Sequence, residues 1–485
     1  MDTAATAPPG TAADSSASTV PAGPRARAAA LRRPALDPYW LALVLFVLYT
    51  LLSVSRHRRM ENMSWDLGIF EQAIRSYAHL QAPVADLKGP GANILGDHFS
   101  PVTALIAPFY RLFPGPATLL VAQALLFAVS VIPVTRVAAH LFGRGRGLLM
   151  GAAYGLSWGV QRAVDFDFHE IAFAMPLLAF ALEAVIRERW YPAMLWAAPL
   201  VLVKEDLGAT VAVIGAVIWL RCRRGGDTRV VLYAIGLAAF GVIASALALG
   251  VIIPGFNGGG DYAYWEKMDS GAAEATIPLD TALRTLAWVL LPTTGLLALR
   301  SPLLLAVLPT LGWRFVSHEE HYWGTDWHYN AVLMPIVFLA LVDAVDRGRR
   351  SPRPWLAAYA RQMPVAVAAA SVALTSSLPL YGLTVPDTYR KPASVAAAER
   401  LLDRIPDDAS VEANVGPISR LTNRCRVFWV GDTRGIEPDY IALKEDPYRT
   451  PEDVAAYARQ LHPGTAYRHL GEAGDVHVLR REGPR

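Results

Sequence analysis

Five short stretches of the sequence place carboxylates, histidines or a lysine among apolar residues. They are SWDLGIFEQAI (64–74), GDHFSP (96–101), DFDFHE (165–170), KED (204–206) and HEEHYWGTDWHYN (318–330). Such groups can transfer protons, bind phosphate oxygens or bind a metal ion. Beside long apolar segments, each is costly unless it contacts water, a partner or a ligand. The ionisable residues of the five stretches are therefore the candidate functional residues.

Asp66 stands between two large apolar residues, in a stretch that predicts an amphipathic helix over 64–80. Leu67, Phe70, Ile74 and Tyr77 recur there at helical spacing. That spacing puts Asp66 beside Phe70 rather than beside the other acid of the stretch, so no carboxylate pair forms within the helix. Two interpretations stay open. Asp66 is either a working carboxylate or the polar edge of a surface helix.

The next two stretches each allow a functional and a structural interpretation. Asp97 and His98 are either part of a site or a turn in which Asp97 caps a helix, and two ligands alone do not make a metal site. In 165–170, the phenylalanines can lie in the membrane interface with the aspartates in water. The alternative assigns Asp167, His169 and Glu170 to substrate binding.

The last two stretches suggest a phosphate contact and a weak metal signal. Lys204 suits a phosphate oxygen as a point-charge donor, whereas Glu205 either joins the site or pairs structurally with a neighbouring cation. In 318–330 the first two histidines are three residues apart, so the pattern is not HExxH. Its aromatic residues also suit an outer membrane interface, and Arg314 just before them can border a lipid or a sugar. No cofactor is assigned, although a divalent metal stays open.

The elements that must position these residues are apolar helices. The chain has 485 residues, of which 53% are hydrophobic and only 18% are charged. Apolar segments of about 15–25 residues recur, which is typical of membrane-spanning helices. They predict about eleven spans, at 39–55, 117–141, 147–161, 171–186, 191–204, 207–221, 230–252, 282–299, 301–313, 330–346 and 363–382.

The charges predict the orientation of these spans. With the N-terminus inside, the short loops at 143–147, 187–191, 221–229 and 347–353 are cytoplasmic and rich in arginine, as the positive-inside rule requires. RHRR (56–59) is the main exception. All five candidate stretches then fall on the outer side. We therefore expect a multi-pass protein of the cytoplasmic membrane whose candidate residues converge on one outward-facing cavity.

Three further regions complete the predicted organisation. Residues 1–36 predict a disordered cytoplasmic tail, and the membrane domain covers 37–383 with a large outer loop at 56–116. That loop holds two surface helices, at 64–80 and 98–113, because counting the second as a span would reverse the later loops. Residues 384–485 predict a small outer α/β domain, with strands at ASVEANV, RCRVFWVG, DYIALKE and DVHVLRR and helices at 393–404 and 451–461.

This organisation resembles the GT-C superfamily of polytopic membrane glycosyltransferases. More narrowly, WDLGIFEQAI, GDHFSPV, FDFHEIAF, KEDLG and ANVGPISRLTNRCRVFWV are similar to a bacterial family of predicted membrane proteins of unknown function. The resemblance implies sugar transfer from a polyprenyl-phosphate donor to an envelope acceptor on the outer face. Asp66 matches the catalytic base. Asp97 and His98 match a second acidic motif, which here has one proline instead of two adjacent ones.

The resemblance leaves the remaining candidates as substrate-binding residues: Asp167, His169, Glu170, Lys204, Glu205 and Arg314. The implied partners are the lipid-linked donor, membrane lipids and an envelope acceptor, and the net charge of +3 gives no sign of a nucleic-acid partner. Two other functions stay open. A transporter would keep its charges near the bilayer midplane, within repeated halves that this sequence lacks. A non-catalytic envelope protein with a transferase-like fold is the third.

Overall fold

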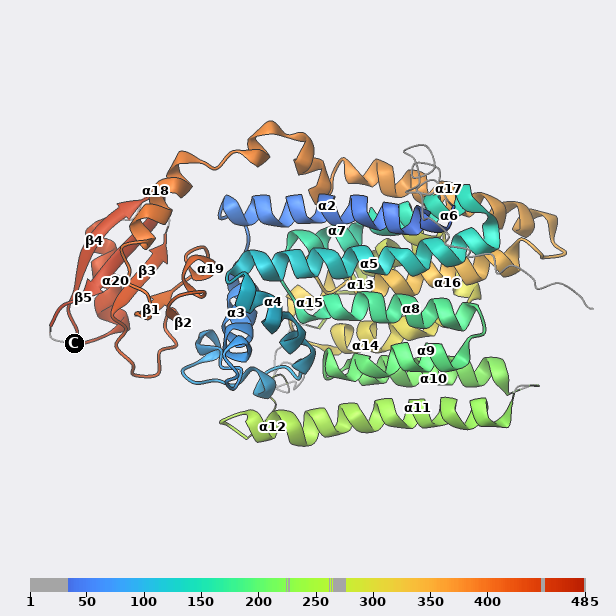
Figure 1. The fold of residues 1–485 in the computed structure, drawn as a ribbon, viewed down its shortest axis with the longest axis horizontal. Helices are drawn as coiled ribbons and strands as arrows, with labels where there is room; N and C mark the ends of the chain where they lie inside the picture. The colour runs from blue at the N-terminus through green and yellow to red at the C-terminus, as the bar shows by residue number, and fades with distance from the viewer. Residues whose placement is uncertain are drawn as a thin grey trace, which may run out of the picture. The chain divides into compact units, whose positions relative to one another are not determined.

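All eleven apolar segments are helical over most of their length in the computed structural model (Figure 1). The structure describes residues 34–223, 225, 227–260, 262, 264, 276–445 and 450–483. The chain divides into two compact units, residues 1–37 and 38–485, and the architecture below is that of the second. The predicted tail lies almost wholly outside the described residues.

The helices follow one another through most of the chain. They are α2 (Asp37–Arg58), α3 (Trp65–Ala78), α4 (Ala107–Leu112), α5 (Pro116–Phe142), α6 (Arg144–Gly155), α7 (Trp158–Asp165), α8 (Ala174–Ile186), α9 (Trp190–Ala197), α10 (Leu207–Cys222), α11 (Thr228–Leu247), α12 (Ile253–Phe256), α13 (Leu279–Thr294), α14 (Leu308–Val316), α15 (Glu320–Trp323), α16 (Leu333–Gly348), α17 (Pro354–Thr375), α18 (Ala393–Leu402), α19 (Ile418–Leu421) and α20 (Pro451–Leu461). A π-helical turn, η7 (Ala248–Ile252), joins α11 to α12.

Among the described residues, three helical stretches are long and apolar enough to cross a membrane unaided: Asp37–Arg58, Pro116–Phe142 and Thr228–Phe256. Shorter apolar stretches lie at Trp190–Leu202, Leu207–Cys222 and Pro302–Val316. The number of spans therefore stays a prediction.

The segment expected as one span at 147–161 is two helices. Helix α6 ends at Gly155 and α7 begins at Trp158. The carbonyl oxygens freed by the break have new donors, because the Tyr49 hydroxyl donates to Gly155 O at 2.6 Å and the Gln161 amide donates to Leu156 O at 2.7 Å. Side chains thus replace the lost helical hydrogen bonds.

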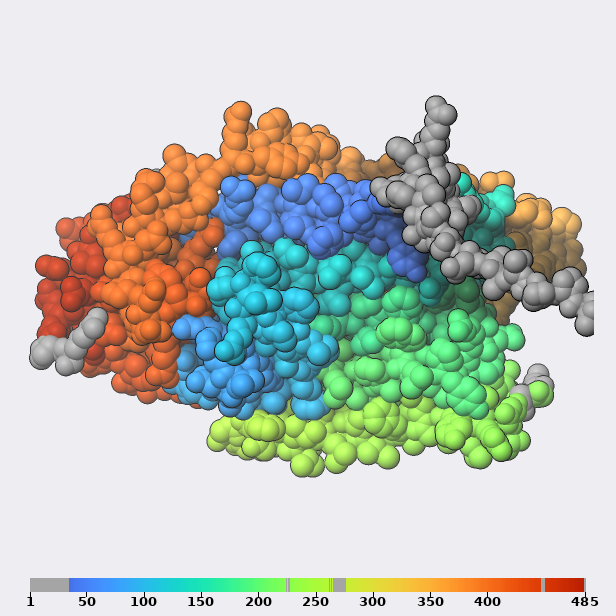
Figure 2. Space-filling view, in the orientation of Figure 1, coloured from blue at the N-terminus to red at the C-terminus, as the bar shows by residue number. Residues whose placement is uncertain are grey.

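The helical core is built around α16, which packs against α5 and α8 and is buried along nearly its whole length. Helix α11, in contrast, packs chiefly on α10 and leaves apolar side chains such as Leu232, Phe240 and Ile243 exposed. Its yellow-green surface forms one edge of the bundle in Figure 2. An exposed apolar helix of this length suits a lipid-facing position.

A five-stranded mixed sheet follows the helices. Its strands are β1 (Ser410–Ala413), β2 (Arg426–Trp429), β3 (Tyr440–Lys444), β4 (Tyr467–Ala473) and β5 (Val476–Arg481). The order is β2-β1-β3-β5-β4, with β1 parallel to β2 and β3, and β5 antiparallel to β3 and β4. The four predicted strands and the two predicted helices of this region are present, and β4 is an addition.

The predicted outer loop packs against this sheet region. Helix α3 is present as expected, but 98–113 is a 3₁₀ turn, η4 (Pro101–Ile106), followed by the short α4. Gln72 of α3 donates to Val427 O at 2.9 Å. Arg426 of β2 forms a two-point ion pair with Asp86, at 2.8 and 2.9 Å. The first contact holds α3 against the sheet, and the second holds the loop that follows α3.

Candidate functional site

A cavity of about 650 Å³ is lined by residues from all five candidate stretches. Its ionisable lining residues are Asp66, Lys88, His98, His169, Lys204, Glu205, Asp206, His321 and His328. Its aromatic lining residues include Trp65, Phe166, Tyr262, Tyr264, Trp313, Tyr322, Trp327 and Tyr329. The cavity is thus both strongly charged and rich in flat apolar faces.

Helix α3 brings Asp66 to the cavity at its first turn. Its apolar face, with Leu67, Phe70 and Ile74, is buried in the helical core. Ser64 precedes the helix in a left-handed conformation, and its hydroxyl accepts the backbone N–H of Gly416 from the loop after β1 at 2.8 Å. The start of α3 is therefore held by the sheet region.

The Asp66 carboxylate is half-buried and accepts no hydrogen bond from the residues that the structure describes. Burial raises its pKa above the ordinary value, while the nearby His169 opposes the rise. A carboxylate in this state is a better proton acceptor than an exposed one.

The loop at 166–170 is held by two amides from distant parts of the chain. Gln123 of α5 donates to Asp167 O at 2.7 Å and accepts from His169 N at 3.0 Å. Asn62 donates to the Asp167 carboxylate at 2.9 Å. His169 thereby faces the cavity, while Asp167 lies behind it.

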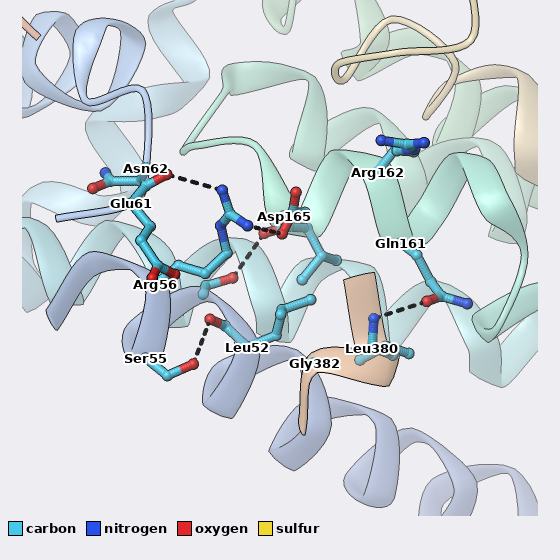
Figure 3. Close-up of polar contacts among 12 residues, drawn as sticks. Leu52, Ser55, Arg56, Glu61, Asn62, Gln161, Arg162, Asp165, Leu380 and Gly382 are labelled. Carbon is cyan, nitrogen blue, oxygen red and sulfur yellow. Dashed lines mark hydrogen bonds and ion pairs between the residues drawn. The ribbon is translucent and has the colours of Figure 1, made fainter. Parts of the chain in front are cut away.

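The end of α7 is tied to the end of α2 just before this loop. Arg56 pairs with Asp165 at 3.0 Å and also donates to Glu61 O at 2.9 Å (Figure 3). Gln161, one helical turn earlier, accepts the backbone N–H of Leu380 at 3.1 Å (Figure 3). One of the positive charges of the RHRR segment, that of Arg56, is therefore paired within the fold.

Charges of alternating sign continue from 204–206 toward the loop before η4. Lys204 lies 3.4 Å from Glu170, and Glu205 lies 3.1 Å from His98 Nδ1. Asp97 lies 3.1 Å from Lys88 and 3.8 Å from His98 Nε2. Burial by itself would raise the pKa of Glu205, but His98 and Lys204 reverse this effect and lower the pKa to about 2. Glu205 is therefore an anion at neutral pH.

Arg314 supports the 318–330 segment from beneath and does not line the cavity. Its fully buried guanidinium donates to Tyr322 O at 2.7 Å, to Gly324 O at 2.8 Å and to the Asn330 side chain at 3.0 Å. These bonds shape a segment that has little regular structure. The result is that Tyr322, Trp327, His328 and Tyr329 face the cavity.

Of the nine candidate residues, the structure brings five to the cavity lining: Asp66, His98, His169, Lys204 and Glu205. Asp97 and Glu170 stand behind them as ion-pair partners, Asp167 positions the loop, and Arg314 supports a wall. Lys88, Asp206 and His328 line the cavity although the sequence did not single them out as site residues. Asp206 and His328 do lie within stretches noted for their charge, whereas Lys88 had no distinguishing pattern.

Comparison with family models decides the membership of the chain. Residues 56–462 match the model described as Predicted membrane protein (DUF2079). The chain belongs to the DUF2079 family. A comparison with curated proteins finds no match.

Two solved structures share the fold of this DUF2079 protein. ArnT from Cupriavidus metallidurans bound to undecaprenyl phosphate has a TM-score of 0.52 and 16% identity, and the match covers 91% of this chain and 99% of that chain. Apo ArnT from the same organism gives 0.51 and 14% over the same shares. The match confirms the resemblance to the GT-C superfamily at the level of the fold.

Proposed function

We propose that this protein is a membrane glycosyltransferase that takes a sugar from a polyprenyl-phosphate donor and transfers it to an acceptor on the outer face of the cytoplasmic membrane. The observation that carries the proposal is the charged, aromatic cavity with Asp66 at its wall, in a fold that resembles ArnT. A structure of that neighbour holds undecaprenyl phosphate, which supports a polyprenyl phosphate as the ligand here.

The cavity has separate features for each part of such a donor. Lys88, His98 and Lys204 can hold phosphate oxygens through charge-assisted hydrogen bonds. The aromatic faces suit the apolar face of a sugar ring. Leu249, in the turn after the exposed helix α11, also lines the cavity and offers the lipid chain an apolar path.

In the proposed reaction, the acceptor hydroxyl attacks the anomeric carbon of the donor sugar. The bond between that carbon and the phosphate oxygen breaks, and the phosphate leaves with the electron pair. The proton of the acceptor hydroxyl passes to Asp66. One carboxylate is sufficient, because a phosphate leaving group needs no protonation, whereas a glycosidase must protonate an alkoxide.

The test uses the purified full-length chain in liposomes with labelled polyprenyl-phosphate sugars and a membrane extract as the source of acceptor. We expect the parent to release free polyprenyl phosphate as the sugar moves to the extract. Asp66→Asn keeps the shape of the side chain and removes the base, so transfer should fall by about 10² or more while donor binding persists.

Asp326→Asn is the matched control, because that carboxylate is mostly exposed and lies outside the cavity lining. It should transfer at the parental rate. Equal rates for Asp66→Asn and the parent would refute the role of Asp66. Movement of intact donor across the bilayer would favour a transporter, and neither movement nor cleavage with any donor would favour a non-catalytic envelope protein.

A further inference from the structure

His328 is a buried polar group in the cavity that nothing described above accounts for. Its side chain lines the cavity and the residue is only 4% exposed. Neither of its ring nitrogens has a hydrogen-bond partner among the described residues. Its ring stacks on that of His169, with centroids 3.7 Å apart. A buried nitrogen without a partner costs free energy, so it points to a ligand.

The other buried histidines near carboxylates behave differently. His98 contacts Glu205 at 3.1 Å, and in the sheet region His462 contacts Glu412 at 2.5 Å. Each of these imidazoles has a carboxylate partner that explains its burial. Neither ring nitrogen of His328 has a carboxylate or any other hydrogen-bond partner among the described residues, which sets it apart.

His169 is oriented as metal-binding histidines usually are. Its Nδ1 lies 2.6 Å from Glu170 Oε2, although the angle departs from that of a good hydrogen bond. The other oxygen of Glu170 lies 3.4 Å from Lys204, so the carboxylate is held from both sides. A carboxylate on Nδ1 favours the tautomer that leaves Nε2 as a lone-pair donor, as in the second shell of many metal sites.

Asp66 completes a set of three ligands. One side-chain ligand atom each from Asp66, His169 and His328 lies within 4.8 Å of the other two. We propose that these three residues bind one divalent transition-metal ion, with zinc as the best fit. Two imidazoles and one carboxylate suit zinc, and three protein ligands leave a position open, as in catalytic zinc sites.

Binding requires the two stacked imidazoles to rotate as well as approach, because the lone pair of each ligating nitrogen lies in the plane of its ring. Atoms that share one zinc at about 2.1 Å lie at most about 4.2 Å apart. The set uses a single oxygen of Asp66, so the second carboxylate oxygen is not required as a ligand. The second oxygen is left to face an acceptor hydroxyl.

The excess of negative charge around the cavity suggests a role for this ion in donor binding. This step rests on the proposed function. Five carboxylates line the cavity or pair with its lining, namely Asp66, Asp97, Glu170, Glu205 and Asp206, against the two lysines Lys88 and Lys204. An anionic donor phosphate would meet this excess of negative charge. A divalent cation at the three ligands offsets it beside the open coordination position.

The first measurement asks whether the metal binds at all. Purified full-length chain without a polyhistidine tag is stripped with chelator, titrated with zinc by calorimetry and checked by elemental analysis after desalting. We expect one tightly bound zinc per chain. Cobalt in the same site should give visible absorption typical of nitrogen and oxygen ligands. Absence of a stoichiometric zinc in the folded parent would overturn the proposal.

The second measurement assigns the ligands. His328→Gln and His169→Gln should each weaken zinc binding by about 100-fold or more, since loss of an outer-shell partner alone costs about 10–100-fold. His321→Gln is the control, because that histidine lines the same cavity but is exposed and pairs with Glu319. It should bind zinc as the parent does. If the control and the two ligand variants lost zinc equally, or all three kept it, the site would be wrong.

Unchanged cobalt absorption in a folded His328→Gln chain would also overturn the assignment, and the parental measurement stands even if a variant fails to fold. The metal site and the proposed function can fail separately. Zinc binding without cleavage of any donor would support the metal site and refute the transferase function. Transfer that proceeds in metal-free protein would support the transferase function and show that the metal ion is not needed for the reaction.

Discussion

Glu71 is a carboxylate of α3 that lies away from the cavity and is fully buried. It accepts hydrogen bonds from Tyr110 of α4, at 2.9 Å, and from the Thr422 hydroxyl beside α19. Burial raises its pKa to about 7, although both hydrogen bonds oppose the rise. One side chain thus links α3 to α4 and to the sheet region, and its charge depends on pH near neutrality.

This raised pKa predicts that stability falls as the pH rises. The folded state holds a proton on Glu71 up to about pH 7, whereas the unfolded state releases it near pH 4.5. Between these values the folded state binds more protons, so its free energy of unfolding decreases by on the order of 3 kcal/mol toward pH 7 and then levels off. Thermal unfolding in detergent from pH 5 to 8 measures the effect.

Glu71→Gln should flatten this pH profile, because the amide has a similar shape and does not titrate. Glu472→Gln is the control, since its side chain is 43% exposed. An unchanged slope in Glu71→Gln would show that another group causes the pH dependence.

At the residue scale, the sequence predicts those site residues whose neighbours mark them. Asp66 and Lys204 interrupt apolar runs, so their placement demands an explanation from the sequence alone. His328 belongs to an aromatic segment that equally suits a membrane interface. Its importance comes from its stacking on His169, a contact between distant parts of the chain that spacing cannot reveal.

Among the elements, α10 and α11 approach each other closely where a glycine of each helix faces the other. A Cβ added at Gly241 would lie 2.3 Å from Gly208 O, and one added at Gly208 would lie 2.3 Å from Gly241 O. This approach brings Ser245 of α11 within 2.6 Å of Glu205 O, to which its hydroxyl donates. The helix pair therefore also supports the cavity wall.

Gly241→Ala should consequently destabilise the protein by about 1–3 kcal/mol through overpacking. Gly236→Ala is the matched control in the same helix, because no atom lies within 4 Å of its added Cβ. Both variants gain the same helix propensity, so the difference between their unfolding midpoints reports the packing alone. Equal midpoints would mean that α11 moves away from α10 without cost.

The presence of helices and strands was easier to predict from the sequence than the break within a helical segment or an edge strand of the sheet. Long apolar runs predict helices, and short apolar runs predict β1, β2, β3 and β5. Strand β4 was not predicted because it is an edge strand with no fully buried position and an irregular pairing at Gly471. The break between α6 and α7 depends on Tyr49 and Gln161, which are distant side chains that local sequence does not disclose.

At the scale of the whole molecule, the predicted inner loops meet one another and the candidate stretches meet elsewhere. Arg221, at the end of α10, lies 2.9 Å from Asp343 of α16 and donates to Val185 O of α8 at 3.3 Å. Arg347 pairs with the same aspartate at 3.0 Å. Three loops that the charge rule places in the cytoplasm thus meet at one end of the bundle, and the side of the membrane that this end faces stays a prediction.

Cysteine labelling in intact cells tests this orientation. Cys222 and Cys425 are 4% and 1% exposed, so a chain without them is the starting point. An impermeant maleimide should label Asp403→Cys, on the exposed surface after α18, in intact cells. Arg350→Cys, whose parent side chain is 66% exposed, should need permeabilised cells. The reverse pattern would invert the topology.

Gln123 holds the loop at 166–170 through the backbone of the loop and not through its side chains. The amide contacts only main-chain atoms of that loop, Asp167 O and His169 N, and so it specifies a path without specifying a side chain. The backbone path at this point therefore does not depend on the side chain of His169. One glutamine of α5 thus fixes where this loop meets the cavity, whichever side chain stands at position 169.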